Sequence, residues 1–406
     1  MRLLIADKLH PKAIEELRSL PIEVSYEPEI TKDALVKRLK GVGILVVRST
    51  EVTEEALEAA RELNLIVRAG PTYGTIDVRA ASKLGIYVSN CPGKNASAVA
   101  ELVYGLMIAI DRRIVDAMMA LRQGRFERAE YGRAEGLLGK TLGIAGLGAI
   151  GREVAARSKA FGLHPLAWSR SLGPARASEL GVGHASSLEE LASRSDVFSL
   201  HLALTDRTRG MVSRKIFSAL RPGSIFINTA RAGLVDHEAM LESVRTRRLR
   251  VGLDVYPDEP RGRTEYATDL FTPPSSDGGF IYGTPHIAAS TDQAQLAIAM
   301  ETTRVIRAFL VEGIVPNVVN VSHGTAARFQ LVIRMQDKVG TLANVLAVIK
   351  RHGINIEEVT NHVFEGGSAA CAKLRLLTRP SEACLKEIRA FDEVLHVDVV
   401  TLPNLA

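Results

Sequence analysis

A glycine-rich turn, Gly146-Leu147-Gly148-Ala149-Ile150-Gly151, lies near the middle of this chain of 406 residues. It follows the apolar run Thr141–Ala145, which predicts a strand, and it opens a helical stretch over residues 152–161. The first glycine permits a tight turn, the second lets the backbone approach a pyrophosphate, and the third lets helix and strand pack closely. The helix N-terminus then offers free N–H groups to phosphates. The turn therefore predicts a dinucleotide-binding α/β fold, with a plain strand–turn–helix as the alternative.

Strands alternate with helices on both sides of this turn, a pattern that favours parallel sheets. Helices are expected at residues 11–19 and 53–61, and a long helix starting at Asn95 leads into the region with the glycine turn. A helix over residues 292–310 should carry the chain back, with residues 315–321 completing the return. The strand candidates are 2–6, Glu23–Tyr26, Ile44–Val47, Leu65–Arg68 and 87–89, followed by Thr141–Ala145, His164–Trp168, Val197–Leu200, 224–228, 251–254 and 282–284.

A composition break at Ser322-His323-Gly324-Thr325 predicts a linker, and residues 261–280 read as a long polar loop. Beyond the linker the order is β-α-β-β-α-β, which is ferredoxin-like, with a hairpin at Gly366-Gly367. Its six segments are 328–335, 339–352, 355–364, 369–378, 380–390 and 394–401. The expected fold class is α/β: two doubly wound parallel-sheet domains, 1–97 with 291–321 and 98–290, and a C-terminal ferredoxin-like α+β domain, 328–406.

Composition excludes several classes of protein. No apolar run approaches the ~20 residues of a membrane helix, and the first residues are too short for a signal peptide. The net charge is +5, and the basic cluster at 245–250 is better read as a solvated helix end than as a nucleic-acid patch. Cys91, Cys371 and Cys384 show neither metal nor disulfide spacing, so we expect no metal and a reducing cytoplasm.

Three polar residues follow strand candidates of the glycine-turn region. Arg231, Glu259 and His286 all come after such strands, and ligands bind at the carboxyl ends of strands in open α/β sheets. A guanidinium can grip a carboxylate and polarise the adjacent carbonyl. A contact from Glu259 would favour the imidazolium form of His286, which could then protonate a carbonyl oxygen as hydride arrives. A surface salt bridge for the arginine and a structural role for the histidine are the alternatives.

The cofactor is expected to be NAD or NADP. Selective NAD sites usually place an acid after the second strand, for the ribose 2′-hydroxyl. This chain has Ser169 followed by Arg170, which can bind a 2′-phosphate instead. We hypothesise that NADP is accepted; a solvated Arg170 with NAD held by other contacts is equally compatible with the sequence.

Together these residues resemble the D-isomer-specific 2-hydroxyacid dehydrogenase family over roughly residues 1–320. The resemblance implies that Arg231 and the backbone near Gly70 and Gly74 hold a substrate carboxylate, and that Arg48 and Arg68 bind a substrate phosphate, unless they form domain salt bridges. Tyr73 departs from the family's usual loop and would reshape the pocket. The implied cofactor contacts are Gly146, Gly148, Ala149, Ile150, Gly151, Ser169, Arg170, Leu202, Thr229, Ala230, Asp254, Ala288 and Ala289.

The last domain resembles an ACT domain, in Asp337-Lys338-Val339-Gly340-Thr341-Leu342 and Gly353-Ile354-Asn355-Ile356. That resemblance implies pairing of copies and an amino-acid effector, serine being the expected one, held by Asp337, Gly340 and Asn355. A pure dimerisation module is the alternative. A homodimer or homotetramer is also expected through the apolar helix of residues 95–122.

The resemblance implies NAD(P)-dependent oxidation of 3-phosphoglycerate to 3-phosphohydroxypyruvate, the first step of serine synthesis, without nucleic-acid or membrane partners. One alternative is a hydroxypyruvate or glyoxylate reductase that uses NADPH. Another is a nucleotide-sensing corepressor, although a scaffold has no physical need for Arg231, Glu259 and His286 together.

Overall fold

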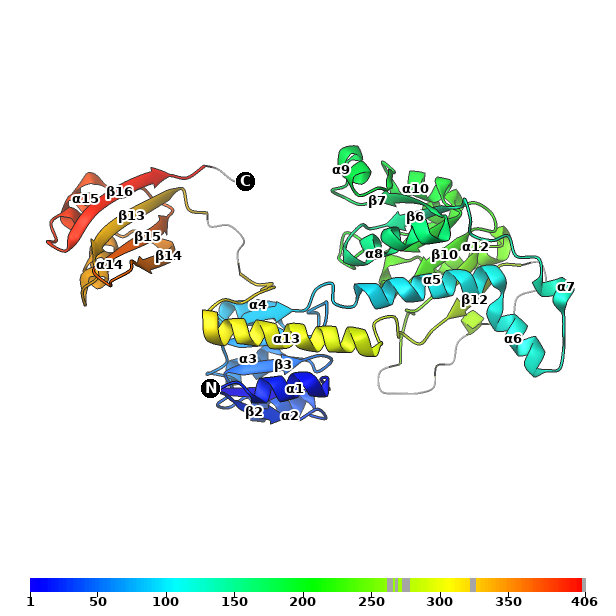
Figure 1. Ribbon diagram of the computed structural model, residues 1–406, viewed down its shortest axis with the longest axis horizontal. Helices are drawn as coiled ribbons and strands as arrows, with labels where there is room; N and C mark the ends of the chain where they lie inside the picture. The colour runs from blue at the N-terminus through cyan, green and yellow to red at the C-terminus, as the bar shows by residue number, and fades with distance from the viewer. Residues whose placement is uncertain (261–265, 267–268, 272–277, 322–325, 404–406) are drawn as a thin grey trace. The chain divides into compact units, whose positions relative to one another are not determined.

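The chain divides into two units, Met1–Asn320 and Val321–Ala406. The computed structural model describes residues 1–260, 266, 269–271, 278–321 and 326–403 (Figure 1). The expected fold class is confirmed, since the first unit contains two parallel sheets with helices and the second contains a four-stranded antiparallel sheet. The expected linker at 322–325 lies outside the described residues, and so does most of the expected loop at 261–280.

The first sheet is parallel throughout, in the order β2-β1-β3-β4-β5. Its central strands are apolar except for an arginine at one end of β1 and of β4, as expected of strands covered on both faces. Helix α2 begins where Thr31 accepts the N–H of Ala34, and α3 where Thr53 accepts that of Ala56. The elements are β1 (Arg2–Ile5), α1 (Pro11–Arg18), β2 (Glu23–Tyr26), α2 (Lys32–Arg38), β3 (Ile44–Val47), α3 (Glu54–Ala59), β4 (Leu65–Arg68), α4 (Val78–Lys83) and β5 (Tyr87–Asn90).

The second sheet has seven parallel strands in the order β12-β11-β10-β9-β6-β7-β8, one more than expected. The extra strand, β8, is only Gly183–His184, too short for an apolar pattern. The elements are β6 (Thr141–Ala145), α8 (Ala149–Ser158), η1 (Lys159–Phe161), β7 (His164–Trp168), α9 (Pro174–Glu179), β8, α10 (Leu188–Arg194), β9 (Val197–Leu200), α11 (Arg214–Ala219), β10 (Ile225–Asn228), η2 (Ala232–Leu234), α12 (His237–Arg247), β11 (Arg250–Leu253), η3 (Asp269–Phe271) and β12 (Phe280–Gly283).

The helix expected over residues 95–122 is interrupted, which corrects the sequence reading. Helix α5 (Ala96–Arg112) ends at Arg113, whose backbone is left-handed at φ 49°, and α6 (Ile114–Arg122) starts in a new direction. The Arg113 side chain pairs with Asp116 and Glu130, the latter in α7 (Arg128–Tyr131), and so fixes the bend. Most of α5 is buried against β10 and β11, whereas α6 leaves apolar side chains exposed.

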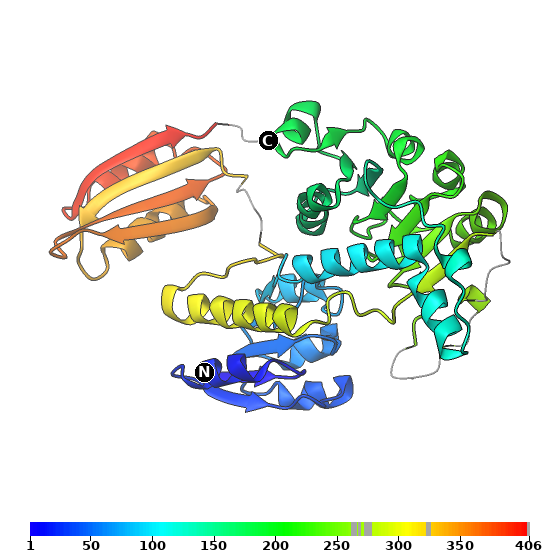
Figure 2. The same ribbon diagram turned by 45° about the vertical axis from the view of Figure 1, so that its right-hand side comes forward.

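Helix α13 (Asp292–Glu312) returns the chain to the first sheet, where it packs against α1 and β4 (Figures 1 and 2). Residues 315–321 continue the return without a named strand: Val319 donates its N–H to the Val88 carbonyl, and a single bridge joins Ser89 to Val318. No helix among the described residues has the length and apolarity to cross a bilayer.

The C-terminal unit follows the expected β-α-β-β-α-β order, with the sheet order β14-β15-β13-β16. From Leu331 to Gln336 of β13, buried residues alternate with less buried ones, because α14 and α15 cover one face of the sheet (Figure 2). Gly366 and Gly367 both have positive φ at the hairpin, as expected. The elements are β13 (Phe329–Gln336), α14 (Thr341–Arg351), β14 (Ile356–Val363), β15 (Ala369–Leu376), α15 (Glu382–Arg389) and β16 (Val394–Thr401).

Candidate functional site

The three glycines between β6 and α8 have three different surroundings. Gly146 has φ 102°, and a Cβ there would meet the His201 carbonyl oxygen at 2.8 Å. A Cβ on Gly151 would meet the Gly146 carbonyl oxygen at 2.0 Å, so only glycine lets the helix approach the strand. A Cβ on Gly148 would meet nothing within 4 Å, so this backbone faces open space at the N-terminus of α8. These surroundings fit a cradle for a pyrophosphate.

The other residues expected at the cofactor lie at carboxyl ends of neighbouring strands. Ser169 and Arg170 follow β7, and Arg170 is exposed. Leu202 follows β9 and lies beside Gly146. Thr229 and Ala230 follow β10, and the Thr229 hydroxyl is buried without a hydrogen-bond partner in the described structure. The structure thus places all of them along one edge of the second sheet.

The turn that carries Arg231 is held from two sides by side chains that sequence reasoning missed. The fully buried Asn228 accepts the Ala230 N–H at 2.9 Å and donates to the Arg231 carbonyl at 3.1 Å. His237, at the start of α12, lies 3.1 Å from the Ala232 carbonyl oxygen. Burial lowers the pKa of His237, which favours the neutral ring, and Nε2 donates to that oxygen in the tautomer that carries its proton there. The sequence did contain a signal for this role of Asn228, because it is a polar residue at the end of an apolar strand.

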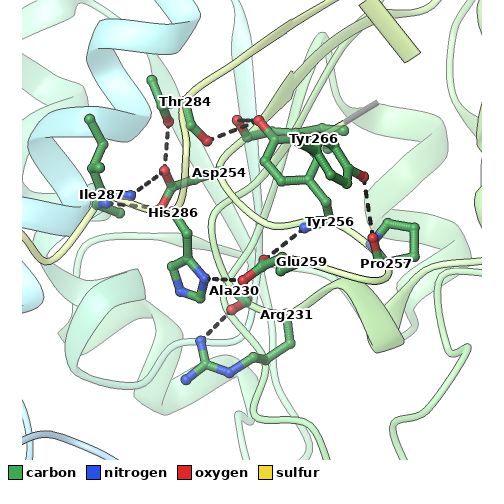
Figure 3. Close-up of polar contacts among 12 residues, drawn as sticks. Ala230, Arg231, Asp254, Tyr256, Pro257, Glu259, Tyr266, Thr284, His286 and Ile287 are labelled. Carbon is green, nitrogen blue, oxygen red and sulfur yellow. Dashed lines mark hydrogen bonds and ion pairs between the residues drawn. The ribbon is translucent and has the colours of Figure 1, made fainter. Parts of the chain in front are cut away.

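His286 and Glu259 meet, as the sequence predicts. The Nδ1 atom of His286 lies 2.6 Å from Oε2 of Glu259, and Figure 3 shows the imidazole pointing at that carboxylate. The other carboxylate oxygen of Glu259 accepts the Tyr256 N–H at 2.9 Å. His286 has a left-handed backbone at φ 52°, which is uncommon outside glycine and is held here by the surrounding turn.

Asp254 holds the turn that carries His286. This carboxylate is completely buried and accepts three hydrogen bonds, from the Thr284 hydroxyl at 2.6 Å, the Ile287 N–H at 2.8 Å and the Ala288 N–H at 2.9 Å (Figure 3). The expected contact between Asp254 and the cofactor stays a prediction, as do those of Ala288 and Ala289. What the structure adds is a structural role, because the charge of Asp254 is satisfied inside the protein.

Tyr256 joins the same two segments and was also missed. Its hydroxyl lies 2.9 Å from the Thr284 carbonyl oxygen and 3.1 Å from that of Leu253, and it can donate to either. Burial, with the charge of Asp254 second, raises the pKa of Tyr256, so the hydroxyl stays protonated. Tyr256 therefore ties the strand end before Glu259 to the strand end before His286.

Arg48 and Arg68 lie at the edge of the first sheet, where the charge of Arg231 also acts on Arg68. Arg68, at the end of β4, is partly buried, and its Nε has no hydrogen-bond partner in the described structure. Burial lowers the pKa of Arg68, and the charges of Arg48 and then Arg231 lower it further. The guanidinium lies over Gly70, where a Cβ would come within 1.6 Å of Nη1. This concentration of positive charge is an anion-binding arrangement.

The expected substrate contacts of Tyr73 and Gly74 and the expected effector contacts of Asp337, Gly340 and Asn355 stay predictions. Tyr73 is exposed and Gly74 has open space around its Cα. In the C-terminal unit, Gly340 starts α14 at φ 90°, and Asn355 donates to Glu357 at 2.9 Å. The Asp337 N–H donates to the Ser368 carbonyl. No group of three His, Cys, Asp or Glu that could hold a metal ion is found among the residues that the structure describes.

A glycine turn with room for a pyrophosphate and a histidine–carboxylate pair at the same sheet edge are features of nicotinamide-dependent dehydrogenases, and the fold and site define that class. Residues 104–288 match the NAD-binding domain of the D-isomer specific 2-hydroxyacid dehydrogenases. A D-3-phosphoglycerate dehydrogenase of Methanocaldococcus jannaschii is 33% identical over all of this chain, which covers 74% of that relative. The chain belongs to the D-isomer-specific 2-hydroxyacid dehydrogenase family.

Two further similarities bear on the choice of substrate. A hydroxypyruvate reductase of Thermotoga maritima is 39% identical over 74% of this chain and 95% of its own length. The NAD⁺-bound 3-phosphoglycerate dehydrogenase of Entamoeba histolytica has a TM-score of 0.64 and 28% identity, over 79% of this chain and 99% of its own. Several D-3-phosphoglycerate dehydrogenases are longer, and the chain spans 63% of a mycobacterial one.

Proposed function

We propose that this dehydrogenase interconverts 3-phosphoglycerate and 3-phosphohydroxypyruvate with NAD(P), the first step of serine synthesis. The observation that carries the proposal is the cluster of Arg48, Arg68 and Arg231. A plain 2-hydroxy acid has one anionic group and would leave two of these cations unpaired. A phosphorylated acid brings a carboxylate and a phosphate, which guanidinium groups bind by charge-assisted hydrogen bonds. The similarity to D-3-phosphoglycerate dehydrogenases supports the same choice.

In the proposed reaction, Arg231 holds the substrate carboxylate together with the backbone at Gly70 and Gly74. Arg48 and Arg68 hold the phosphate. The bound nicotinamide supplies or accepts the hydride at the substrate carbon.

His286 moves the proton. In the direction of reduction, the imidazolium gives its Nε2 proton to the carbonyl oxygen, and in oxidation the neutral ring accepts the hydroxyl proton. Glu259, at 2.6 Å from Nδ1, fixes the tautomer and stabilises the charged ring. Arg231 stabilises negative charge that develops on the carbonyl oxygen.

NAD is the cofactor expected of the matched domain. We propose that NADP is also accepted, because Ser169 stands where an acid would repel a 2′-phosphate and the exposed Arg170 follows it. The expected cofactor contacts of the glycine turn, Leu202, Thr229, Ala230 and Asp254 belong to the same proposal.

A hydroxypyruvate or glyoxylate reductase is the second candidate. It is favoured by the similarity to the Thermotoga maritima relative and by Tyr73, whose exposed ring stands at the expected substrate loop. A corepressor without activity is disfavoured, because the His286–Glu259 pair is assembled as catalysis requires.

We also propose roles for the domains, an oligomeric state and a cellular location. Residues 1–97 with 291–321 would be the substrate domain, 98–290 the cofactor domain, and 328–406 an ACT-like domain with an amino-acid effector near Asp337, Gly340 and Asn355. The exposed apolar side chains of α6 support a homodimer or homotetramer. A cytoplasmic location is proposed from the three free cysteines.

Initial rates would test the substrate. The purified protein is assayed with 3-phosphohydroxypyruvate, hydroxypyruvate and glyoxylate, each with NADH and NADPH. The proposal requires the highest kcat/KM with the phosphorylated acid. A preference for the unphosphorylated acids with NADPH would instead establish the reductase.

A further inference from the structure

A buried carboxylate, that of Asp7, contacts the backbone of Arg48. Asp7 is the second residue after β1, and it is only 8% exposed. Because β1 lies beside β3 in the parallel sheet, the end of β1 adjoins the end of β3, which leads into Arg48. Asp7 therefore stands under the turn that carries one of the two arginines proposed to bind phosphate.

Asp7 accepts four hydrogen bonds from that turn. Oδ2 accepts the backbone N–H groups of Arg48 at 2.6 Å, Ser49 at 3.1 Å and Thr50 at 3.0 Å. Oδ1 accepts the Ser49 hydroxyl at 2.8 Å. Three successive N–H groups that converge on one oxygen form a concave anion site, and here the protein's own carboxylate fills it.

This arrangement has two consequences for a substrate anion. The backbone of residues 48–50 is not free to bind phosphate, so the guanidinium groups must do so. Asp7 also adds negative charge near Arg68, which raises the pKa of that arginine, though by less than burial, Arg48 and Arg231 lower it. Asp7 would thus weaken phosphate binding by its charge alone, and its presence needs a geometric reason.

We propose that Asp7 is a positioning residue that fixes the Arg48 turn so that the Arg48 guanidinium meets the phosphate of the substrate. The inference rests on the proposed function and deepens it, because it makes Asp7 a determinant of specificity for phosphorylated over unphosphorylated acids. Asp7 acts through Arg48, and it has no part in hydride or proton transfer.

The test uses the full chain with NADH and compares kcat/KM for 3-phosphohydroxypyruvate and for hydroxypyruvate. Asp7→Ala frees the turn, and a misplaced guanidinium should lower kcat/KM for the phosphorylated acid by roughly 10²-fold. For hydroxypyruvate the change should stay within about threefold, because Arg48 has nothing to bind. Asp7→Asn keeps one acceptor oxygen and should fall between the wild type and Asp7→Ala.

A double-mutant cycle with Arg48→Ala separates positioning from stability. Once Arg48 is absent, adding Asp7→Ala should lower kcat/KM for the phosphorylated acid no further. Thr31→Ala is the matched control, because Thr31 caps α2 in the same part of the chain at 3.3 Å from the Ala34 N–H. Thr31→Ala should lower Tm and leave the preference between the two acids unchanged.

The outcomes distinguish the two proposals. If the wild type prefers hydroxypyruvate, the proposed function fails and the role of Asp7 fails with it. If the wild type prefers the phosphorylated acid, three results would each overturn the role of Asp7 alone. They are equal losses on both acids, tighter binding of the phosphorylated acid by Asp7→Ala or Asp7→Asn, and additive losses in the cycle.

Discussion

The imidazole Nδ1 of His286 lies 2.6 Å from Oε2 of Glu259, although the two residues are 27 positions apart in the chain. Neighbouring groups hold both residues in place through hydrogen bonds. The Tyr256 N–H binds the other oxygen of Glu259, and Asp254 binds the backbone of Ile287 and Ala288 next to His286. Among the residues that the structure describes, no hydrogen bond to Nε2 of His286 is found, and this nitrogen is the one proposed to exchange a proton with the substrate.

Substitutions in the His286–Glu259 pair are expected to lower turnover and to preserve cofactor binding. His286→Asn removes the proton donor and should lower kcat by ~10²–10⁴-fold. Glu259→Gln keeps a hydrogen-bonding group but removes the charge that stabilises the imidazolium, so a smaller loss is expected. Steady-state kinetics measure kcat, and quenching of protein fluorescence measures NADH affinity. Normal turnover in His286→Asn would end the assignment.

The glycine turn predicts opposite effects for two similar substitutions. Gly148→Ala places a methyl group where no atom lies within 4 Å, so Tm should hold while the Kd for NADH rises by roughly tenfold. Gly151→Ala places it 2.0 Å from the Gly146 carbonyl oxygen, so the helix must move, at about 1–3 kcal/mol. Thermal unfolding and NADH titration of both variants check this. A lower Tm in Gly148→Ala with unchanged NADH affinity would contradict it.

Glu301 predicts a loss of stability in acid. It is 6% exposed and binds Arg304, Asn317 and Lys94, and the hydrogen bonds from Arg304 above all lower its pKa to about 2. Because the folded pKa lies below the unfolded value, this stabilisation is complete above about pH 4.5 and is lost as pH falls toward 2. Glu301→Gln should cost about 2 kcal/mol at pH 7, with a Tm deficit that shrinks toward pH 3.

Glu58, exposed on α3, provides the matched control for that experiment. Glu58→Gln should leave Tm within the error of the wild type at both pH values. A Glu301→Gln deficit that stays constant between pH 7 and pH 3 would show that the carboxylate charge does not carry the stabilisation.

Arg170 predicts the balance between NADP and NAD. Arg170→Ala removes a cation that can pair with the 2′-phosphate, so the ratio of kcat/KM for NADPH to that for NADH should fall roughly tenfold. Ser169→Asp should lower the same ratio by repulsion. Rates with both cofactors measure it, and an unchanged ratio in Arg170→Ala would end the proposal.

The apolar face of α6 predicts self-association. Ile114, Val115, Met118 and Met119 are exposed there. Met119→Glu should shift sedimentation toward smaller species, because a charge buried in an interface without a partner is costly. The control is Leu84→Glu, at an exposed position after α4, and it should leave the sedimentation unchanged. A second methionine, Met211, packs against a hydrophobic core and would not serve as a control. Equal sedimentation of the wild type and Met119→Glu would contradict the α6 interface.

Much of the architecture could be predicted, because apolar runs and glycine spacing within short segments indicate the strands and turns. The apolar run Ile44–Val47 and the mostly apolar segment Val197–Leu200 gave strand positions that the structure reproduces, and Gly146, Gly148 and Gly151 fixed the turn between β6 and α8. The two-residue strand β8 and the break at Arg113 were not predicted from the sequence. A strand that short has no periodicity, and an arginine in the left-handed conformation has no local sequence signature.

The sequence by itself determined which chemical groups are available, because Arg231, Glu259 and His286 each follow a strand that can be recognised from its own residues. Only the tertiary structure decided which groups meet. The 2.6 Å contact of His286 with Glu259, the charge of Arg231 near Arg68, and the grip of Asp7 on the Arg48 turn all join strand ends far apart in sequence. Such contacts depend on strand order and parallel pairing, and these are set by packing across the whole sheet rather than by any local run of residues.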